Sequence, residues 1–202
     1  MIMDKFIFPD NLIDPGINFL DYEIPWMVPE SLYFLDNLLN SNDIVLDIGS
    51  GGSTIYFLKT CKKVYSIETD KEWFNLVNDK INQKNLHENL TYFNLEFEQI
   101  NDYIQSITDT ITVTTIDTIN RKNRTKVFEK IISSKKIPEI IILDNWASKK
   151  VFKGIYNLTS EELISMYNLH QYQIFDFYHP QWFGNGTRIL VHNSRLNNQA
   201  SI

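Results

Sequence analysis

Cysteine is almost absent from this sequence. Cys61 is the only one among 202 residues, which excludes an internal disulfide and a multi-cysteine zinc site. No run approaches the roughly 18 apolar residues of a membrane span. The first ten residues lack the basic start and apolar stretch of a secretory signal. We therefore expect a cytoplasmic protein without a membrane span.

Basic residues are fewer than acidic residues in this sequence. Lysine and arginine number 19 against 25 aspartates and glutamates, which gives a net charge of −6. Proteins that bind nucleic acid or anionic membranes through the phosphate groups usually carry a basic field. The balance predicts no general nucleic-acid binding. With 43% hydrophobic residues, the chain has the composition of a globular protein and the length of one domain.

The order of the predicted elements indicates an α/β fold. Residues 1–28 form an irregular, aromatic N-terminal arm, and residues 29–202 form the core of a single domain spanning 1–202. Strands and helices then alternate, which predicts parallel βαβ units with helices on both faces of the sheet. The last two strands are joined without room for a helix, so they should pair antiparallel. The predicted strands are 43–48, 63–68, 89–95, 111–117, 139–143, 172–178 and 187–192, and the predicted helices are 29–39, 53–60, 71–82, 96–107, 123–134 and 161–168.

A glycine-rich turn follows the first strand, and an acidic residue ends the second. Glycines let the backbone turn sharply between a strand and a helix and approach a ligand closely. Glu68 lies where a strand-end carboxylate can hold two ribose hydroxyls. A nicotinamide enzyme is the near alternative, but Thr54 stands where its fingerprint has a third glycine. Asp47, just before the turn, suits a ligand with a positively charged ammonium group.

Asp47-Ile-Gly-Ser-Gly-Gly together with Glu68 resembles motif I and the acidic motif of class I S-adenosylmethionine-dependent methyltransferases. The resemblance runs from about residue 30 to the end. It implies a Rossmann-like sheet of order 3-2-1-4-5-7-6 with the seventh strand reversed. It implies S-adenosylmethionine as cofactor, bound by the turn, by Glu68 and by residues near the end of strand three. The implied cofactor residues are Asp47, Gly49, Ser50, Gly51, Gly52, Ser53, Thr54, Glu68, Thr69 and Glu96.

Polar side chains also end strands four and five. Asp117, Asp144 and Asn145 should converge beside the cofactor crevice, because adjacent parallel strands end side by side. Their oxygens suit Mg²⁺ or another divalent cation, and the pattern resembles metal-dependent O-methyltransferases. The lysine that usually follows the strand-four aspartate is absent, and Asn120 and Arg121 lie in that stretch. A metal-free polar pocket and plain capping roles for the aspartates stay open.

Asp117, Asp144 and His179 are the candidate catalytic residues. His179 lies in the loop before the last strand and could act as a general base. Arg121 and Arg124 could bind an anionic group of the substrate, but a solvated helix start is the favoured interpretation. Trp26 is interpreted as a cover for the cofactor or an anchor for the arm. The predicted function is O-methylation of a small-molecule acceptor or glycan. A nicotinamide-dependent oxidoreductase, a non-catalytic binding module and a homo-oligomer formed through the arm stay open.

Overall fold

The structure is a computed structural model of the chain. It describes residues 18–117, 123–134, 136–146, 155, 158–178 and 186–199. Within these residues, no helix has both the length and the apolar composition that a membrane span requires.

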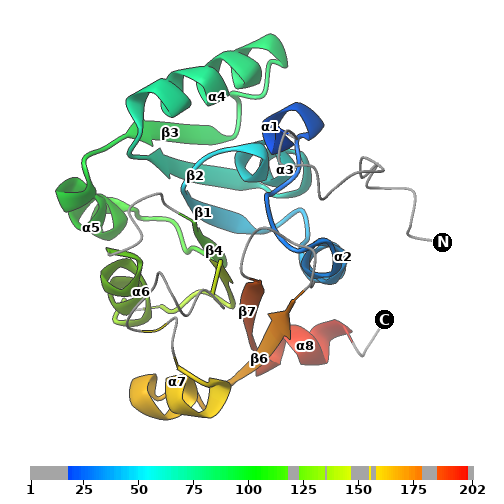
Figure 1. Cartoon of the computed structure of the whole chain (residues 1–202), viewed down its shortest axis with the longest axis vertical. Helices are drawn as coiled ribbons and strands as arrows, with labels where there is room; N and C mark the ends of the chain where they lie inside the picture. The colour runs from blue at the N-terminus through cyan, green and yellow to red at the C-terminus, as the bar shows by residue number, and fades with distance from the viewer. Residues whose placement is uncertain are drawn as a thin grey trace.

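One seven-stranded sheet forms the centre of the molecule (Figure 1). Its order is β3-β2-β1-β4-β5-β7-β6, which confirms the predicted topology. β1 to β5 pair in parallel, whereas β7 runs antiparallel to both of its neighbours, β5 and β6. The strands are β1 Ile44–Ile48, β2 Lys63–Glu68, β3 Leu90–Asn94, β4 Val113–Ile116, β5 Ile140–Asp144, β6 Tyr172–Phe177 and β7 Thr187–His192.

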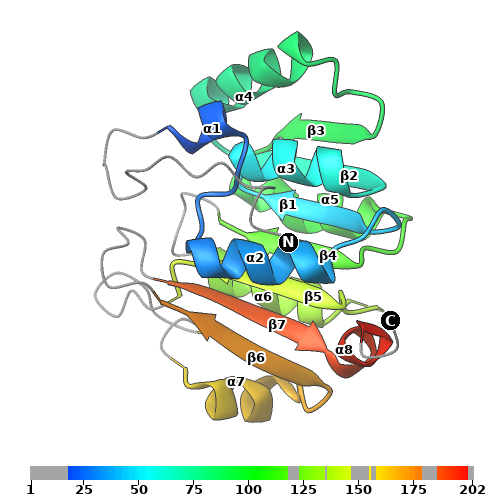
Figure 2. The same cartoon turned by 90° about the vertical axis from the view of Figure 1, so that its right-hand side faces the viewer.

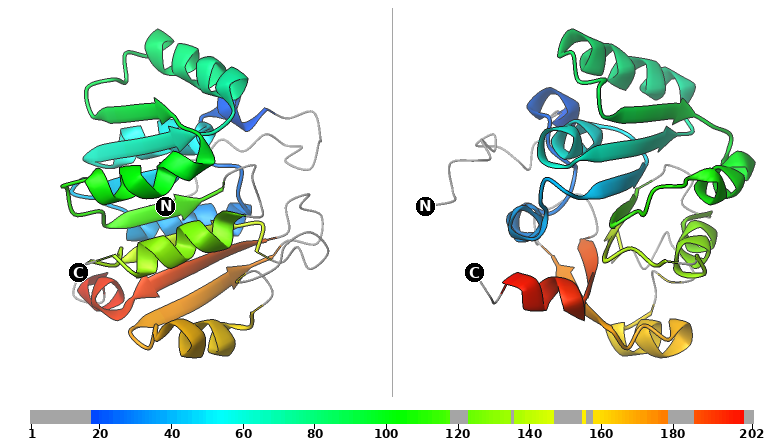
Figure 3. Two further views of the ribbon diagram at one scale, coloured as in Figure 1. Left: turned by 90° about the vertical axis from the view of Figure 1, so that its left-hand side faces the viewer. Right: turned by 180° about the vertical axis from the view of Figure 1, so that it is seen from behind.

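Helices cover both faces of this sheet, as predicted. α2 and α3 lie in front of the sheet in Figure 2, and α5 and α6 lie in front of it when it is seen from the opposite side in Figure 3. Each face has its own apolar core: one is formed with α2 and α3, the other with α5, α6 and α7. The helices are α1 Phe19–Tyr22, α2 Pro29–Leu38, α3 Gly52–Thr60, α4 Lys71–Gln83, α5 Phe97–Ser106, α6 Arg124–Ile132, α7 Ser160–Tyr167 and α8 Asn193–Gln199.

The central strands are buried because helices cover both faces of the sheet. Every residue of β4 and β5 is buried, the burial expected of strands in a doubly covered parallel sheet. Because β1, β2, β4 and β5 run in parallel, their carboxyl ends lie at the same edge of the sheet.

Two short helices were not expected. The prediction of an irregular arm over residues 1–28 is wrong for α1, which is a single turn started by the Asn18 side chain accepting from the Leu20 amide. A four-residue helix is too short to show an apolar period. α8 is mostly polar, and Arg195 fixes it by donating to the Leu38 carbonyl and pairing with Asp43.

Candidate functional site

The turn after β1 has the backbone shape that its glycines suggested. Gly49 has φ of 101°, in the region that favours glycine. Its amide donates to the Ile67 carbonyl at 2.9 Å, which ties the turn to the end of β2. The Gly51 amide donates to the Thr54 hydroxyl at 3.2 Å. The turn is thus fixed by bonds to its own helix and to the neighbouring strand.

Asp47 lies beneath this turn and is fully buried. Its carboxylate accepts from the hydroxyls of Thr54 at 2.6 Å, Ser53 at 3.2 Å and Thr115 at 3.4 Å. Burial raises the pKa of Asp47 to about 7, and the nearby charge of Asp117 acts in the same direction. The Asp47 carboxylate is enclosed and organises the turn, and its predicted contact with a ligand's ammonium group stays a prediction. Thr54 is needed for its hydrogen bond to Asp47, which accounts for its presence in place of a third glycine.

Glu68 ends β2 with a buried carboxylate that accepts four hydrogen bonds. One oxygen accepts from the amides of Thr69 at 2.7 Å and Asp70 at 2.9 Å. The other accepts from the amide and the hydroxyl of Ser50, at 3.0 and 3.1 Å. The Ser50 hydroxyl also lies 2.6 Å from the Tyr92 hydroxyl. Burial raises the pKa of Glu68, and these hydrogen bonds oppose the rise.

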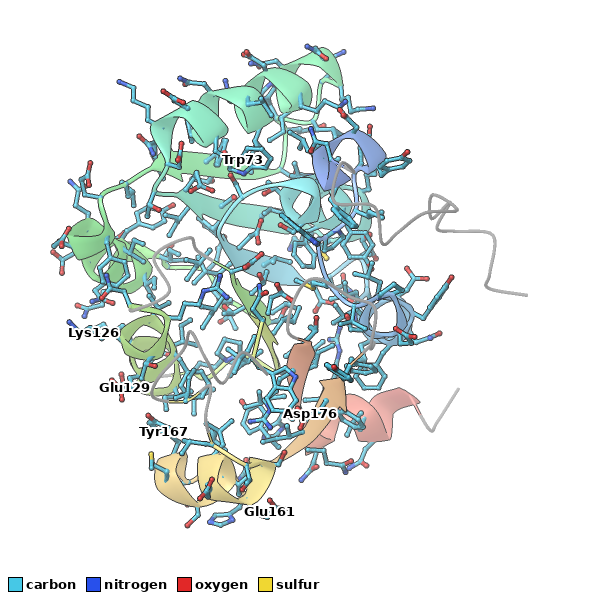
Figure 4. The ribbon with its side chains drawn as sticks, in the orientation of Figure 1. Trp73, Lys126, Glu129, Glu161, Tyr167 and Asp176 are labelled. Atoms are coloured by element: carbon cyan, nitrogen blue, oxygen red, sulfur yellow. The ribbon has the colours of Figure 1, made fainter. Side chains whose placement is uncertain are left out.

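Trp73 of α4 contacts the glycine turn, a role that the sequence interpretation missed. Its indole nitrogen donates to the Ser50 carbonyl at 2.7 Å, and a Cβ added to Gly51 would lie 3.8 Å from its ring. Figure 4 shows Trp73 beneath α4, toward the sheet. The sequence placed Trp73 only on the apolar stripe of a helix. Its position in the first turn after the strand-end acid is the signal that could have found it.

A side chain at position 52 would collide with the backbone of the N-terminal arm, so this position requires glycine. A Cβ at this position would lie 2.0 Å from the Ile24 carbonyl oxygen and 2.7 Å from the Phe19 carbonyl oxygen. Glu23 forms ion pairs with Lys59 and Lys84, which hold the arm against α3 and the end of α4. The predicted cofactor role of Gly52 therefore stays untested, while its structural role is defined.

The remaining predicted cofactor residues lie near the ends of β2 and β3. Thr69 follows Glu68 directly and is half-buried. Glu96 is exposed at the N-cap of α5, and its backbone amide donates to the Gln99 side-chain oxygen at 2.9 Å. Asn94 donates to the Glu68 carbonyl at 3.0 Å, which joins the two strand ends. The adenine site predicted near Glu96 stays a prediction.

Asp117 and Asp144, at the ends of strands four and five, lie close together, and Arg124 forms hydrogen bonds to both. Its guanidinium donates to the Asp117 carboxylate at 2.7 Å and to the Asp144 carbonyl at 2.9 Å. Only 3% of Arg124 is exposed, so its interpretation as part of a solvated helix start is wrong. Asp144 is also buried, and its carboxylate accepts from the Thr187 hydroxyl at 3.0 Å and from the Asn145 amide.

Asp117, Arg124, Asp144, Asn145 and Thr187 form a second polar cluster. Burial raises the pKa of Asp144 well above its usual range, and the neighbouring Asp117 charge adds to the rise, while Arg124 opposes it. Asn145 has φ of 59° and turns its side-chain nitrogen toward Asp144.

The predicted divalent cation does not fit these residues, because Arg124 already holds the Asp117 carboxylate. Among the residues that the structure describes, no group of three histidine, cysteine, aspartate or glutamate side chains could hold a metal ion.

Several other candidates can be placed only in part. His179 and Arg121 lie outside the described residues, so the proposed general base stays a prediction. Trp26 is 55% exposed and stacks on Phe19 with ring centroids 5.5 Å apart. The next residues of the arm reach the second cluster, since the Val28 amide donates to the Thr187 hydroxyl at 3.2 Å.

Arg188 was not anticipated either. Its guanidinium is buried, pairs with Asp176 at 2.6 and 2.9 Å, and stacks over Trp146 at 4.0 Å. Asp176 projects from β6 in Figure 4. The stack fixes Trp146, which follows Asp144 and Asn145 at the end of β5. A buried arginine in a strand of β-branched residues gives no local sequence signal of its partner.

Comparison with solved structures identifies the fold. An O-methyltransferase of Bacillus cereus in complex with S-adenosylhomocysteine aligns with a TM-score of 0.61 at 15% identity, over 95% of this chain and 94% of that chain. The chain has the class I methyltransferase fold. No protein-family model matches the sequence, and a search of curated proteins finds no relative.

Enzymes that act on nucleic acid also share this fold. An rRNA methylase of Streptococcus thermophilus aligns with a TM-score of 0.55 at 14% identity, over 81% of this chain and 94% of that chain. A dimethyladenosine transferase of Plasmodium falciparum aligns with a TM-score of 0.54 at 18% identity, over 85% of this chain. This chain spans 65% of the length of that transferase. These likenesses do not fit the expectation of no general nucleic-acid binding, and they leave the acceptor to be argued from the site.

Proposed function

We propose that this protein transfers a methyl group from S-adenosylmethionine to an oxygen atom of a small polar acceptor such as a sugar or glycan. The observation that carries the proposal is the Glu68 carboxylate, buried at the end of β2 and bonded to Ser50 of the glycine turn. It lies in a sheet with an antiparallel β7 between β5 and β6. The doubly wound nicotinamide fold has no such inserted strand, which favours the methyl donor over the nicotinamide alternative.

The residues around Glu68 fit the ribose of the cofactor. A carboxylate offers about four acceptor positions, and Ser50 takes two of the four bonds to Glu68. A ribose hydroxyl that donates to Glu68 would take the place of the Ser50 hydroxyl. That hydroxyl would keep a partner, because the Tyr92 oxygen is only 2.6 Å away. The exchange leaves no buried polar group without a hydrogen bond.

Methyl transfer to a hydroxyl requires alignment of the reacting atoms more than it requires chemical activation by the protein. The cofactor supplies a methyl group already activated on a sulfonium, and in-line attack by the acceptor oxygen breaks the carbon–sulfur bond while the hydroxyl proton leaves to a base or to water. The protein must hold the acceptor oxygen in line, and alignment alone can supply much of the rate. Asp117, whose side chain is 31% exposed, is the residue of the second cluster placed to accept a hydrogen bond from such a hydroxyl.

The charge of the chain favours a neutral acceptor over RNA. At the site itself, Arg124 compensates the Asp117 carboxylate, and the raised pKa values of Asp47 and Asp144 lower the charge of those two groups. The whole chain, however, carries a net charge of −6. A polyanionic acceptor would approach the chain against repulsion, whereas a neutral polyol can donate to the oxygens of the site without that cost.

Calorimetry with S-adenosylhomocysteine tests the cofactor. We expect the wild type to bind and Glu68→Ala to bind at least about tenfold more weakly, because it loses hydrogen bonds to a charged group. Glu72→Gln changes an exposed acid in the next helix and should bind as the wild type does. Equal binding by the wild type and Glu68→Ala would contradict the proposal, and tighter binding of NADH would favour the oxidoreductase.

The acceptor class needs a separate assay. Purified protein with S-adenosylmethionine is offered neutral sugars and glycans in one arm and ribosomal RNA in the other, and products are detected by the mass of one added methyl group. Methylated sugar supports the proposal, and methylated RNA alone contradicts the acceptor class. Cofactor binding without turnover in either arm would favour the non-catalytic module.

A further inference from the structure

Arg124 is the centre of the polar cluster at the ends of β4 and β5. It begins α6, and its side chain reaches back to the sheet and bonds two adjacent strand ends at once. One guanidinium nitrogen lies 2.7 Å from the Asp117 carboxylate, and the other lies 2.9 Å from the Asp144 carbonyl oxygen. The register places these residues side by side, since Ile116 pairs with Leu143 one position earlier.

The guanidinium and a divalent cation would both lie against the Asp117 carboxylate. Magnesium binds oxygen ligands at about 2.0–2.1 Å in near-octahedral geometry, and a second full positive charge at that spot would meet the charge of Arg124. Arginine cannot resolve the conflict by losing its proton, because a guanidinium keeps its charge in proteins. A cation bound to Asp117 would therefore face the full charge of the buried arginine.

The other two predicted ligands are also engaged by protein donors. Asp144 accepts from the Thr187 hydroxyl with one carboxylate oxygen and from the Asn145 amide with the other. The Asn145 backbone is in the left-handed region, with φ of 59°, and its side chain presents nitrogen to Asp144. These bonds satisfy both Asp144 oxygens without a cation.

We infer that the Arg124 guanidinium occupies the position that a divalent cation would take at the ends of β4 and β5, so that the acceptor site works without a metal. This inference rests on the proposed function in one respect, namely that the cluster is the site where the acceptor binds. Arg124 does for Asp117 what a cation would do: it compensates the charge and fixes the carboxylate. Arg124 is therefore a positioning residue, and it acts through Asp117.

Titration with Mn²⁺, followed by electron paramagnetic resonance of the free ion, tests this assignment in the full chain. The wild type should show no saturable binding up to about 1 mM, the range of weak protein sites for divalent ions. Arg124→Met keeps the apolar stem and removes the charge, so it should gain one site. Arg124→Met combined with Asp117→Asn should lose that site again. The gain and its loss together would assign the binding to the Asp117 carboxylate.

Two results would overturn the inference. One is saturable Mn²⁺ binding by the wild type that Asp117→Asn abolishes. The other is a folded Arg124→Met protein, checked by circular dichroism, that gains no site. If Arg124→Met does not fold, the comparison of wild type with Asp117→Asn decides alone: absence of saturable binding in the wild type supports the inference.

This experiment is independent of the methyl donor. Its readout is metal binding, whereas the proposed function stands or falls on S-adenosylhomocysteine binding and the Glu68→Ala variant. A protein that binds S-adenosylhomocysteine and also binds Mn²⁺ through Asp117 would refute only the role of Arg124. A protein that binds neither would refute only the proposed function.

Discussion

The buried carboxylate of Asp47 should make the stability of this protein fall as the pH rises from about 4 to about 7. The pKa of Asp47 is raised from 3.8 to about 7 in the folded protein. The folded state therefore binds a proton that the unfolded state has already lost in this window, and the free energy of unfolding decreases with rising pH. Each pH unit corresponds to about 1.4 kcal/mol. The full window of about three units corresponds to about 4 kcal/mol.

Asp47→Asn isolates this effect, because other buried acids titrate in the same direction. Glu68 and Asp144 also have raised pKa values, so the pH dependence of the wild type alone would not identify Asp47. Asparagine has nearly the same shape and no ionisable proton. The difference between the unfolding free energies of Asp47→Asn and wild type should therefore shift in favour of the variant by up to about 4 kcal/mol between pH 4 and pH 8.

Urea unfolding at steps of half a pH unit measures this difference. Asp79→Asn, at an exposed acid of α4, is the matched control and should give a difference that stays constant with pH. The reasoning is refuted if the Asp47→Asn difference is also constant between pH 4 and pH 8. The Asp47 carboxylate would then titrate as an ordinary solvated acid, and the hydroxyls around it would not be holding a buried group.

Three further changes probe other parts of the site. Gly52→Ala should destabilise the protein by more than about 2 kcal/mol in urea unfolding, because its Cβ would lie 2.0 Å from the Ile24 carbonyl oxygen. Tyr92→Phe should weaken S-adenosylhomocysteine binding about threefold to tenfold in calorimetry, because the Ser50 hydroxyl released by the ribose would lose its partner. Arg188→Met should lower the free energy of unfolding by about 3 kcal/mol, since it leaves the carboxylate it pairs with uncompensated.

For each of these three predictions, one experimental result would contradict it. Gly51→Ala is the control for Gly52→Ala, because its Cβ would meet only the Trp73 ring, at 3.8 Å. Equal stabilities of the two alanine variants would show that the arm does not pack as the structure places it. Unchanged binding by Tyr92→Phe would contradict the exchange at Ser50. An Arg188→Met protein as stable as the wild type would show that the bond to Asp176 is not needed for folding.

The parallel core and the antiparallel final pair could be predicted because local patterns indicated them. Alternating strands and helices and the short connection before the last strand favoured this arrangement, and the strand order was implied by the resemblance of the glycine turn and Glu68 to class I methyltransferases. The sheet agrees with both. α1 could not be predicted, because one helical turn depends on a cap and on packing against α3. Short elements of this kind are stabilised by tertiary contacts, which a local pattern does not contain.

The sequence predicted which strand ends would form the site, but not the hydrogen bonds and ion pairs between its residues. That Asp117 and Asp144 would meet followed from the parallel strands, and the structure brings them together. The role of Arg124 did not follow, because a charged residue at the start of a helix normally faces solvent. Its burial depends on two partners that lie 7 and 20 residues away in the chain. The same holds for Asp47, whose partners come from both the turn and β4.

The N-terminal arm links the two halves of the candidate site. At one end, Ile24 packs directly on Gly52 at the start of α3. Four residues later, the Val28 amide donates to the Thr187 hydroxyl, which in turn donates to the Asp144 carboxylate. A displacement of the arm would therefore disturb the glycine turn and the strand-five carboxylate together. Because these contacts are made by backbone atoms of the arm, they depend on its path more than on its side chains, and Gly52 is the residue whose replacement would change that path most directly.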